Sequence, residues 1–305
     1  MRAMRLGMGS TAINDGTIDD VVGEARRAVE GGFDTFWVSQ IFSHDSLTVL
    51  GIVGREVPGI ELGTAVVPTY PRHPMMLAQQ ALTVQAASGG RLCLGIGLSH
   101  QIVVESMWGI PFTKPVRHLR EYLSVLMPLL EGKQVAFEGD DYRVHGAVAV
   151  AGSTRPVVLV AALGAQMLRV TGALADGTTT WCVGAKTLAD LTIPTIRQAA
   201  ADAGRPEPRI HCTLPVLVTD DVDAARKRAA HVFAIYDQLP SYKTMMNREG
   251  VDGPADLAII GTAAEVRDEV AALAGIGVTD FGAGVFAANA DEAAATVAAL
   301  QAVRS

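Results

Sequence analysis

Short apolar segments alternate with helical segments along almost the whole chain. About eight stretches are predicted as strands, because they are short and rich in apolar and β-branched residues. They are continuously apolar rather than alternating, which is typical of parallel strands that are covered on both faces. The pattern therefore predicts an α/β fold with a parallel sheet inside a layer of helices. The predicted strands are 4–9, 35–38, 60–67, 92–97, 157–162, 178–181, 210–218 and 281–286.

This number of strand–helix units in 305 residues favours a single (β/α)8 TIM barrel over a doubly wound sheet, which has about five or six strands. No linker divides the chain, so we expect one domain over 1–305. Residues 133–155 contain a turn signal between two short apolar runs and predict a small hairpin, on the face opposite the active site. Segments 98–116 and 236–258 are expected to cover the catalytic face.

Charge and composition limit the partners of the protein. The chain has 25 Lys and Arg against 32 Asp and Glu, and no basic cluster long enough to follow a nucleic-acid backbone. The longest charge-free stretch, 74–90, contains several polar side chains, so no membrane span is expected. The amino terminus lacks the pattern of a secretory signal, and the three cysteines lack a metal-binding or disulfide pattern. We expect a cytoplasmic protein that acts on a small molecule and holds no metal.

In a TIM barrel, the active site is built from residues just beyond the C-terminal ends of the strands. These positions contain no carboxylate pair, no HxH or HExxH motif and no lysine within an apolar strand, which disfavours glycosidase, metallohydrolase and class I aldolase activities. Their small and hydroxyl side chains suit a protein that leaves the difficult chemistry to a cofactor. The set comprises Gly9, Ser10, Ser39, Gln40, His44, Pro68, Thr69, Tyr70, Arg72, His73, Gly97, Ser99, His100, Ala162, Leu163, Gly164, Trp181, Pro215 and Asn289.

Two local patterns have alternative interpretations. Glycines in the strands, as at Gly95 and Gly97, would let a flat ring lie against the backbone or would make room for a bulky neighbour. Residues 164–168 follow the fifth strand and open a helix, so their free backbone N–H groups would hold a phosphate, or would form an ordinary turn. A dinucleotide fingerprint at 7–12 is disfavoured, because no acidic residue ends the next strand.

Several longer motifs resemble a known family. The runs LGTAVVPTYPRHP at 62–74 and GGRLCLGIG at 89–97 are similar to the luciferase-like superfamily, most closely to its coenzyme F420-dependent oxidoreductases of actinobacterial type. Shorter matches at 78–80, 107–112, 117–122 and 174–177 extend the similarity over nearly the whole chain. The resemblance implies a TIM barrel that holds a flavin or a deazaflavin at its strand ends, hydride transfer at the ring, and often a homodimer. It also implies a cis peptide bond between Ala65 and Val66.

The chain departs from the sugar-phosphate dehydrogenases of that family. They have Asp-His after the second strand and Glu after the fourth, where this chain has Gln40-Ile41 and His100. Their acid–base scheme therefore does not transfer. We expect a reductase that transfers hydride from reduced F420 to an activated C=C or C=N bond. The alternatives are an FMN-dependent monooxygenase and a non-enzymatic flavin-binding protein.

The predicted site has a catalytic and a cofactor-binding part. His100 is the expected hydrogen-bond donor or acid near the reacting ring, and His73 and Gln40 are further catalytic candidates, although buried histidines are often only structural. The predicted cofactor contacts, some from strand-end position and some from the resemblance, are Gly9, Ser39, Ala65, Val66, Arg72, Gly97, Leu98, Ser99, Ala162, Leu163, Gly164, Ala165, Gln166 and Trp181.

Overall fold

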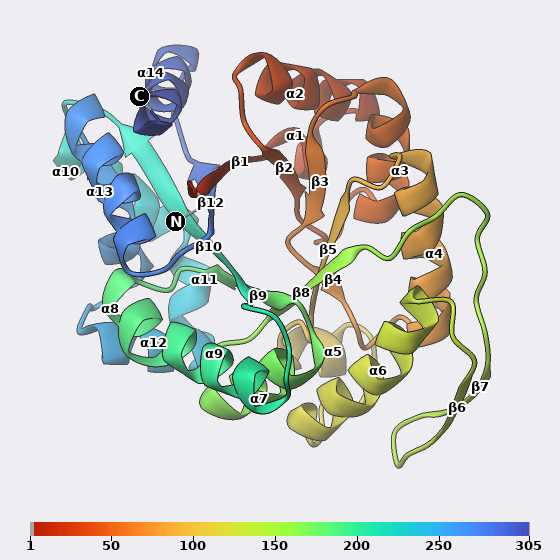
Figure 1. Ribbon diagram of the computed structural model, residues 1–305. Helices are drawn as coiled ribbons and strands as arrows, with labels where there is room; N and C mark the ends of the chain where they lie inside the picture. The colour runs from red at the N-terminus through yellow and green to blue at the C-terminus, as the bar shows by residue number, and fades with distance from the viewer. Residues whose placement is uncertain (1–2, 305) are drawn as a thin grey trace.

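The computed structural model, which describes residues 3–304, is a closed barrel of parallel strands inside a ring of helices (Figure 1). The pairing runs from each strand to the next and closes between the last strand and the first. The predicted TIM barrel is therefore confirmed. In order around the barrel, the strands are β1 (Arg5–Gly9), β2 (Thr35–Val38), β3 (Glu61–Thr64) with β4 (Val67–Pro68), β5 (Leu92–Gly97), β8 (Val157–Ala161), β9 (Gly177–Trp181), β10 (Arg209–Val218) and β12 (Asp280–Val285).

Several of the helices begin where short polar side chains cap them. Thr17 and Asp20 form a capping box at one helix, and Thr262 and Glu265 form another, as the sequence predicts. No helix between residues 3 and 304 combines the length and the apolarity that a membrane crossing requires. The helices are α1 (Ala12–Asp15), α2 (Ile18–Glu30), α3 (Ser46–Glu56), α4 (Pro74–Ala87), α5 (Gln101–Ser106), α6 (Pro115–Leu130), α7 (Ala165–Leu174), α8 (Ala185–Thr187), α9 (Ile193–Asp202), α10 (Val222–Val232), α11 (Ala234–Asp237), α12 (Pro240–Glu249), α13 (Ala263–Gly275) and α14 (Ala290–Gln301).

The predicted strands agree with the structure to within one residue at each end, with two exceptions. The third strand, predicted as 60–67, is interrupted at Ala65 and Val66, and the peptide bond between them is cis, as the resemblance implies. A short additional strand, β11 (Ile259–Gly261), was not predicted and pairs with the end of β10. Three residues are too few for a hydrophobic period, so only the pairing with β10 defines this strand.

The segment 133–155 forms an antiparallel hairpin of β6 (Val135–Glu138) and β7 (Arg143–Gly146). Its expected position opposite the active site is wrong for the turn, which lies beside the N-terminal half of α6. There, the Glu121 carboxylate accepts the backbone N–H groups of Asp140, Asp141 and Tyr142 at 2.8–3.1 Å. Arg117, in the first turn of α6, pairs with both aspartates at 2.6 Å. These contacts fold the hairpin back along the helix toward the catalytic rim.

Charged side chains fill the end of the barrel at which the strands begin. Arg209 pairs with Glu61 at 2.9 Å and also with Asp280, and Arg5 pairs with the same two carboxylates at 3.0 and 3.5 Å. Each of the four residues is the first of its strand. Since the Asp280 side chain is only 4% exposed, the two cations provide the compensation that a buried carboxylate requires.

Two stacked rings lie farther inside the barrel. The rings of Trp37 and His211 have centroids 3.9 Å apart and planes inclined by 12°. Burial lowers the pKa of His211 to about 3, so its ring is neutral. A Cβ atom on Gly282 would lie 2.6 Å from the histidine ring, and one on Gly63 would overlap the indole. These strand glycines therefore make room for bulky side chains, which is the second of the two interpretations that the sequence left open.

Candidate active site

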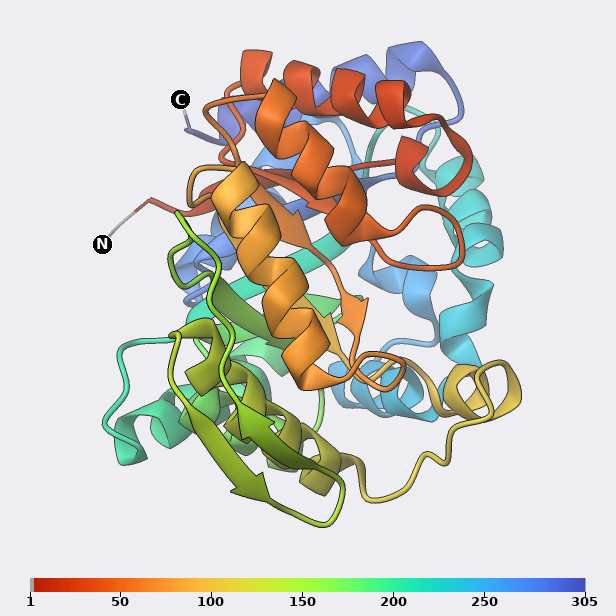
Figure 2. The ribbon, with the colours of Figure 1, turned by 90° about the vertical axis from the view of Figure 1, so that its right-hand side faces the viewer.

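The C-terminal ends of the strands meet at the face that Figure 2 shows on the right, away from both chain termini. The loops after β2 and β5 and the helices α10, α11 and α12 lie over this face (Figures 1 and 2). The segments 98–116 and 236–258, predicted as covers, lie on this side of the barrel. The predicted contacts Gly9, Ser39, Gly97, Ala162 and Trp181 end strands or directly follow them, so the fold gathers them around the C-terminal end of the barrel, hereafter the opening.

The interruption between β3 and β4 is held in place by Thr64 and Gly97. The Thr64 hydroxyl donates to the Gly95 carbonyl at 2.7 Å and accepts the Gly95 N–H at 2.9 Å, so a side chain continues the ladder where the backbone cannot. A Cβ atom on Gly97 would lie 2.7 Å from the Val66 side chain. The absence of that Cβ lets Val66 pack onto β5 at the predicted cofactor face.

His100 lies at the opening, three residues after Gly97, where β5 ends. Ser99 has φ of 66°, which turns the chain, and His100 is then the residue that precedes α5. The imidazole is half-buried, and its centroid lies 5.9 Å from that of Tyr242 in α12. Burial lowers the pKa of His100 below its ordinary value. The ring is therefore neutral at pH 7 and offers one N–H donor and one acceptor nitrogen.

The other catalytic candidates and Arg72 have structural partners. His73 is exposed, and its Nδ1 accepts a backbone N–H of α4 at 3.2 Å, which caps that helix. The Gln40 side-chain oxygen accepts the backbone N–H and the hydroxyl of Ser46 at 2.8 and 2.9 Å. Arg72 pairs with Asp45 at 2.5 Å. These contacts hold the loops of the rim in place, while the catalytic roles of His73 and Gln40 stay predictions.

The N-terminus of α7 has no side-chain cap, unlike those of α3, α10 and α14. Asp45 caps α3, Asp221 caps α10 and Asn289 caps α14, and the Glu249 carboxylate accepts two backbone N–H groups at the start of α8. Gly164 precedes α7 in an extended conformation, and a Cβ atom there would meet no atom within 4 Å. The first N–H groups of this helix donate to no side-chain cap, and a free helix N-terminus suits a bound anion.

An aromatic cluster covers the opening on the side of β9, and the sequence did not reveal it. Trp181, at the end of β9, contacts Phe233 and Tyr236 edge to face, with centroids 5.6 and 5.9 Å apart. Tyr236 in turn contacts Tyr242 at 5.0 Å, and Phe233 contacts Phe286 at 5.6 Å. The only available signal was that two of its members, Tyr236 and Tyr242, belong to the segment 236–258, already predicted as a cover.

A second aromatic group lies behind the end of β4. The ring of Tyr70 stacks on that of His118, with centroids 3.9 Å apart and planes inclined by 2°. The Thr69 hydroxyl lies 2.9 Å from His118 Nε2, and burial lowers the pKa of this histidine to about 4. Within residues 3–304, the Tyr70 hydroxyl is buried without a hydrogen-bond partner, which is uncommon for a buried polar group.

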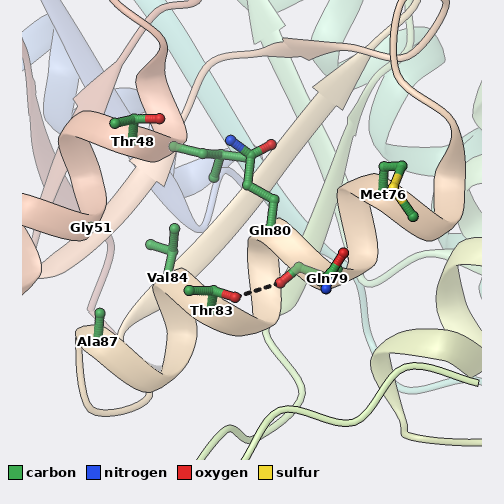
Figure 3. A pocket seen from close by; sticks show the side chains of 9 residues that line it. Thr48, Gly51, Met76, Gln79, Gln80, Thr83, Val84 and Ala87 are labelled. Atoms are coloured by element: carbon green, nitrogen blue, oxygen red, sulfur yellow. Dashed lines mark hydrogen bonds between the residues drawn. The ribbon is translucent and has the colours of Figure 1, made fainter.

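A shallow groove of about 410 Å³ lies outside the barrel, between α3 and α4 (Figure 3). None of its lining side chains is titratable, and within the groove the Thr83 hydroxyl bonds to the Gln79 carbonyl of its own helix at 2.8 Å. The groove therefore lacks the groups that catalysis needs and lies away from the strand ends. Its lining residues are Leu47, Thr48, Gly51, Met76, Gln79, Gln80, Thr83, Val84 and Ala87.

Comparisons with known proteins agree with this geometry. The family model described as luciferase-like monooxygenase matches residues 4–280. A 5,10-methylenetetrahydromethanopterin reductase from Methanolobus tindarius is 28% identical over 258 residues, which cover 84% of this chain and 78% of the relative. The coenzyme F420-dependent tetrahydromethanopterin reductase from Methanopyrus kandleri has the same fold, with a TM-score of 0.79 and 21% identity over 98% of both chains.

An FMN-containing structure is also similar. The oxygenating constituent of 3,6-diketocamphane monooxygenase from Pseudomonas putida, in complex with FMN, has a TM-score of 0.76 and 16% identity over 98% of this chain and 96% of its own. At such identities the two structures establish the fold alone. The match over most of the sequence confirms the resemblance seen in the motifs. The protein is therefore an enzyme, and the chain belongs to the luciferase-like monooxygenase family.

Proposed function

We propose that the protein is an F420-dependent oxidoreductase that works as a reductase, with hydride passing from reduced F420 to an activated C=C or C=N bond of a small molecule. The observation that carries this proposal is the chemistry of the opening. Of the predicted strand-end histidines and arginine, His100 alone has a side chain without a hydrogen-bond partner within residues 3–304. One neutral imidazole cannot supply redox chemistry, so a bound cofactor must supply it.

The residues at the opening fit such a cofactor. The uncapped start of α7 would receive its phosphate on the N–H groups of Ala165 and Gln166, and the backbone at Ala65-Val66 would lie against its ring. When bound in its reduced form, F420 supplies hydride. Trp181 and Tyr242 would exclude water from the ring, and the neutral His100 would donate a hydrogen bond to the substrate atom that gains charge.

The acidic tail of F420 needs cations at the rim. Of the basic residues that the sequence suggests for this role, Arg72 pairs with Asp45 and Lys243 pairs with Asp237 at 2.8 Å. Arg248 is exposed and forms no ion pair within residues 3–304, so it is the candidate that remains. The names of the relatives support F420 over FMN, while the FMN-bound monooxygenase with the same fold keeps an FMN-dependent monooxygenase as the second candidate. A homodimer in the cytoplasm stays a prediction from the sequence.

The purified apo-protein is expected to bind F420 more tightly than FMN. The reason is that the opening offers an uncapped helix start for a phosphate and an unpaired cation, Arg248, for an acidic tail that FMN lacks. Titration calorimetry of both cofactors under identical conditions measures the difference. Preferential binding of FMN, with oxygen consumption when the bound flavin is reduced, would instead favour the monooxygenase.

The variant Gly164→Asp is expected to weaken binding of F420 by about tenfold or more while leaving folding intact. Aspartate at this position would cap α7, which stabilises a helix by about a few tenths of a kcal/mol relative to glycine. Its carboxylate would also accept the N–H groups that the phosphate needs, and its negative charge would repel the phosphate. Each tenfold loss of affinity corresponds to about 1.4 kcal/mol of binding free energy. The matched control is Gly164→Asn, which caps without a charge. Equal affinity of the two variants for F420 would place the phosphate elsewhere.

A further inference from the structure

The end of helix α12 is bound to the start of α8 by one side chain. The Glu249 carboxylate accepts the backbone N–H groups of Lys186 and Thr187, one on each oxygen, at 3.0 and 2.8 Å. Glu249 is the last residue of α12, and both donors belong to α8. Figure 1 shows the two helices side by side. The carboxylate therefore joins the cover segment 236–258 to the chain just beyond β9.

Gly184 makes room for this carboxylate. It precedes α8 with φ of −77° in an extended conformation that any residue adopts, so the backbone does not require a glycine. A Cβ atom on Gly184 would overlap the Glu249 carboxyl group, which occupies that space instead. An alanine here would push the carboxylate away from its two N–H donors. Because the displaced group is the far end of a flexible side chain, the fold can absorb this change.

The other end of the same helix face contacts His100. Tyr242 and Glu249 lie about two turns apart on one face of α12. Between them, Met245 and Met246 are buried, so this face points into the protein. The Tyr242 ring contacts the His100 ring, with centroids 5.9 Å apart and planes inclined by 59°. A shift of α12 would therefore move the Tyr242 ring relative to the imidazole.

The position of the imidazole depends on packing. The His100 side chain has no hydrogen-bond partner within residues 3–304, and among those residues Tyr242 provides the one aromatic ring in contact with it. The charged residue of the adjoining helix α5, Glu105, accepts from the Gln101 side chain at 3.1 Å and from the Phe112 N–H at 3.2 Å. Burial is the cause that lowers the pKa of His100. The titration of His100 is therefore a direct measure of how closely its surroundings pack against it.

We propose that Glu249 is a positioning residue for His100. By holding the end of α12 on the start of α8, its carboxylate keeps the Tyr242 ring against the imidazole at the opening. Loss of the carboxylate frees this end of α12, Tyr242 moves away, and His100 becomes more exposed to water. The inference rests on the proposed function for its effect on turnover, but the coupling between Glu249 and His100 can be measured on the apo-protein.

A double-mutant cycle of Glu249→Ala and Gly184→Ala tests this coupling. The readout is the pKa of His100 in the apo-protein, from an NMR titration of its ring C–H signals, which are assigned by their loss in His100→Gln. Each single variant is expected to raise this pKa toward the ordinary value, because a more exposed imidazole protonates more readily. The double variant should show no further rise, since a displaced carboxylate and an absent one are equivalent. Asn247→Ala, an exposed change in the same helix, is the control and should leave the pKa unchanged.

Two results would overturn the positioning role. One is an unchanged pKa of His100 in both single variants, and the other is a pair of shifts that add in the double variant. Glu249→Gln keeps one of the two acceptor oxygens and should give a smaller rise than Glu249→Ala. If Glu249→Ala does not fold, Glu249→Gln and Gly184→Ala provide the same test.

Turnover provides the second measurement. With F420 bound and 3-penten-2-one as substrate, kcat is expected to fall by about tenfold to a hundredfold in Glu249→Ala and Gly184→Ala, with little change in F420 affinity. Normal kcat in variants with a raised pKa of His100 would overturn the role of Glu249 in the reaction. If F420 fails to bind the unaltered protein while the cycle behaves as expected, the proposed function is overturned and the coupling between Glu249 and His100 stands.

Discussion

Replacement of Arg209 by methionine is expected to destabilise the folded protein by about 3–5 kcal/mol, because it leaves buried carboxylates without their main partner. Arg209 contacts both Glu61 and Asp280 at the end of the barrel where the strands begin. In the variant, Arg5 would be the one remaining arginine beside these two carboxylates. Urea unfolding at pH 7 measures the loss. The control is Arg26→Met, since Arg26 and Glu56 form a pair whose side chains are 54% and 47% exposed. Such a surface pair contributes at most about 1 kcal/mol.

The pH dependence separates this explanation from a simple packing defect. In the native protein, burial opposes ionisation of Asp280, but Arg209 and its hydrogen bonds lower the pKa of that carboxyl below its ordinary value. The stabilisation is therefore present above the unfolded pKa of about 3.9 and is lost as the pH falls through the folded value. Without Arg209, burial raises the pKa of Asp280, so stability is lost as the pH rises. The difference between the two proteins should shrink from pH 7 toward pH 4. A difference that is the same at both pH values would contradict the electrostatic explanation.

The strands and their order were predictable because local pattern and chain topology decide them. Continuous apolar runs at 35–38 and 92–97 match β2 and β5 residue for residue. Once a barrel is expected, the residues after each strand must lie together, which places His100 and Gly164 at one opening. The hairpin turn was misplaced because its position depends on Glu121 and Arg117, which lie about twenty residues earlier in a different element.

Long-range packing decides the features that the sequence did not reveal. Gly63 is a glycine because Trp37, on the neighbouring strand, occupies the space of its Cβ atom. The charged cluster at the end where the strands begin joins residues as distant in sequence as Arg5 and Asp280. In the sequence, each of these residues alone looks like an ordinary solvated side chain. Phe233 and Tyr236 belong to a segment without a clear period, so their contact with Trp181 was not visible in the sequence. Local propensity carries no information on such contacts.

Replacement of His100 by alanine is expected to lower kcat/KM by about 10²–10⁴-fold without a matching loss of F420 affinity. His100 is half-buried at the opening, and its centroid lies 5.9 Å from that of Tyr242. Alanine removes the donor but no predicted contact to the cofactor. The measurement is steady-state turnover of a 3-alken-2-one, combined with calorimetric titration of F420 into the same variant. Normal turnover by a folded, F420-bound His100→Ala protein would assign the histidine a structural role.

The pH profile then distinguishes a neutral donor from an imidazolium acid. Burial lowers the pKa of His100 below its ordinary value, so the neutral ring predominates at pH 7. If an N–H donor is all that His100 supplies, kcat/KM stays constant as the pH falls from 7 toward that lowered pKa, because protonation leaves the donor in place. An imidazolium acid would instead make kcat/KM rise as the pH falls. The variant His100→Gln keeps an N–H donor but cannot titrate, so it should recover part of the rate if His100 is a donor and should abolish the rise at low pH if His100 is an acid. A residue that only supports the fold would change neither the rate nor its pH dependence on replacement by Gln, so this profile assigns the role of His100 at the opening.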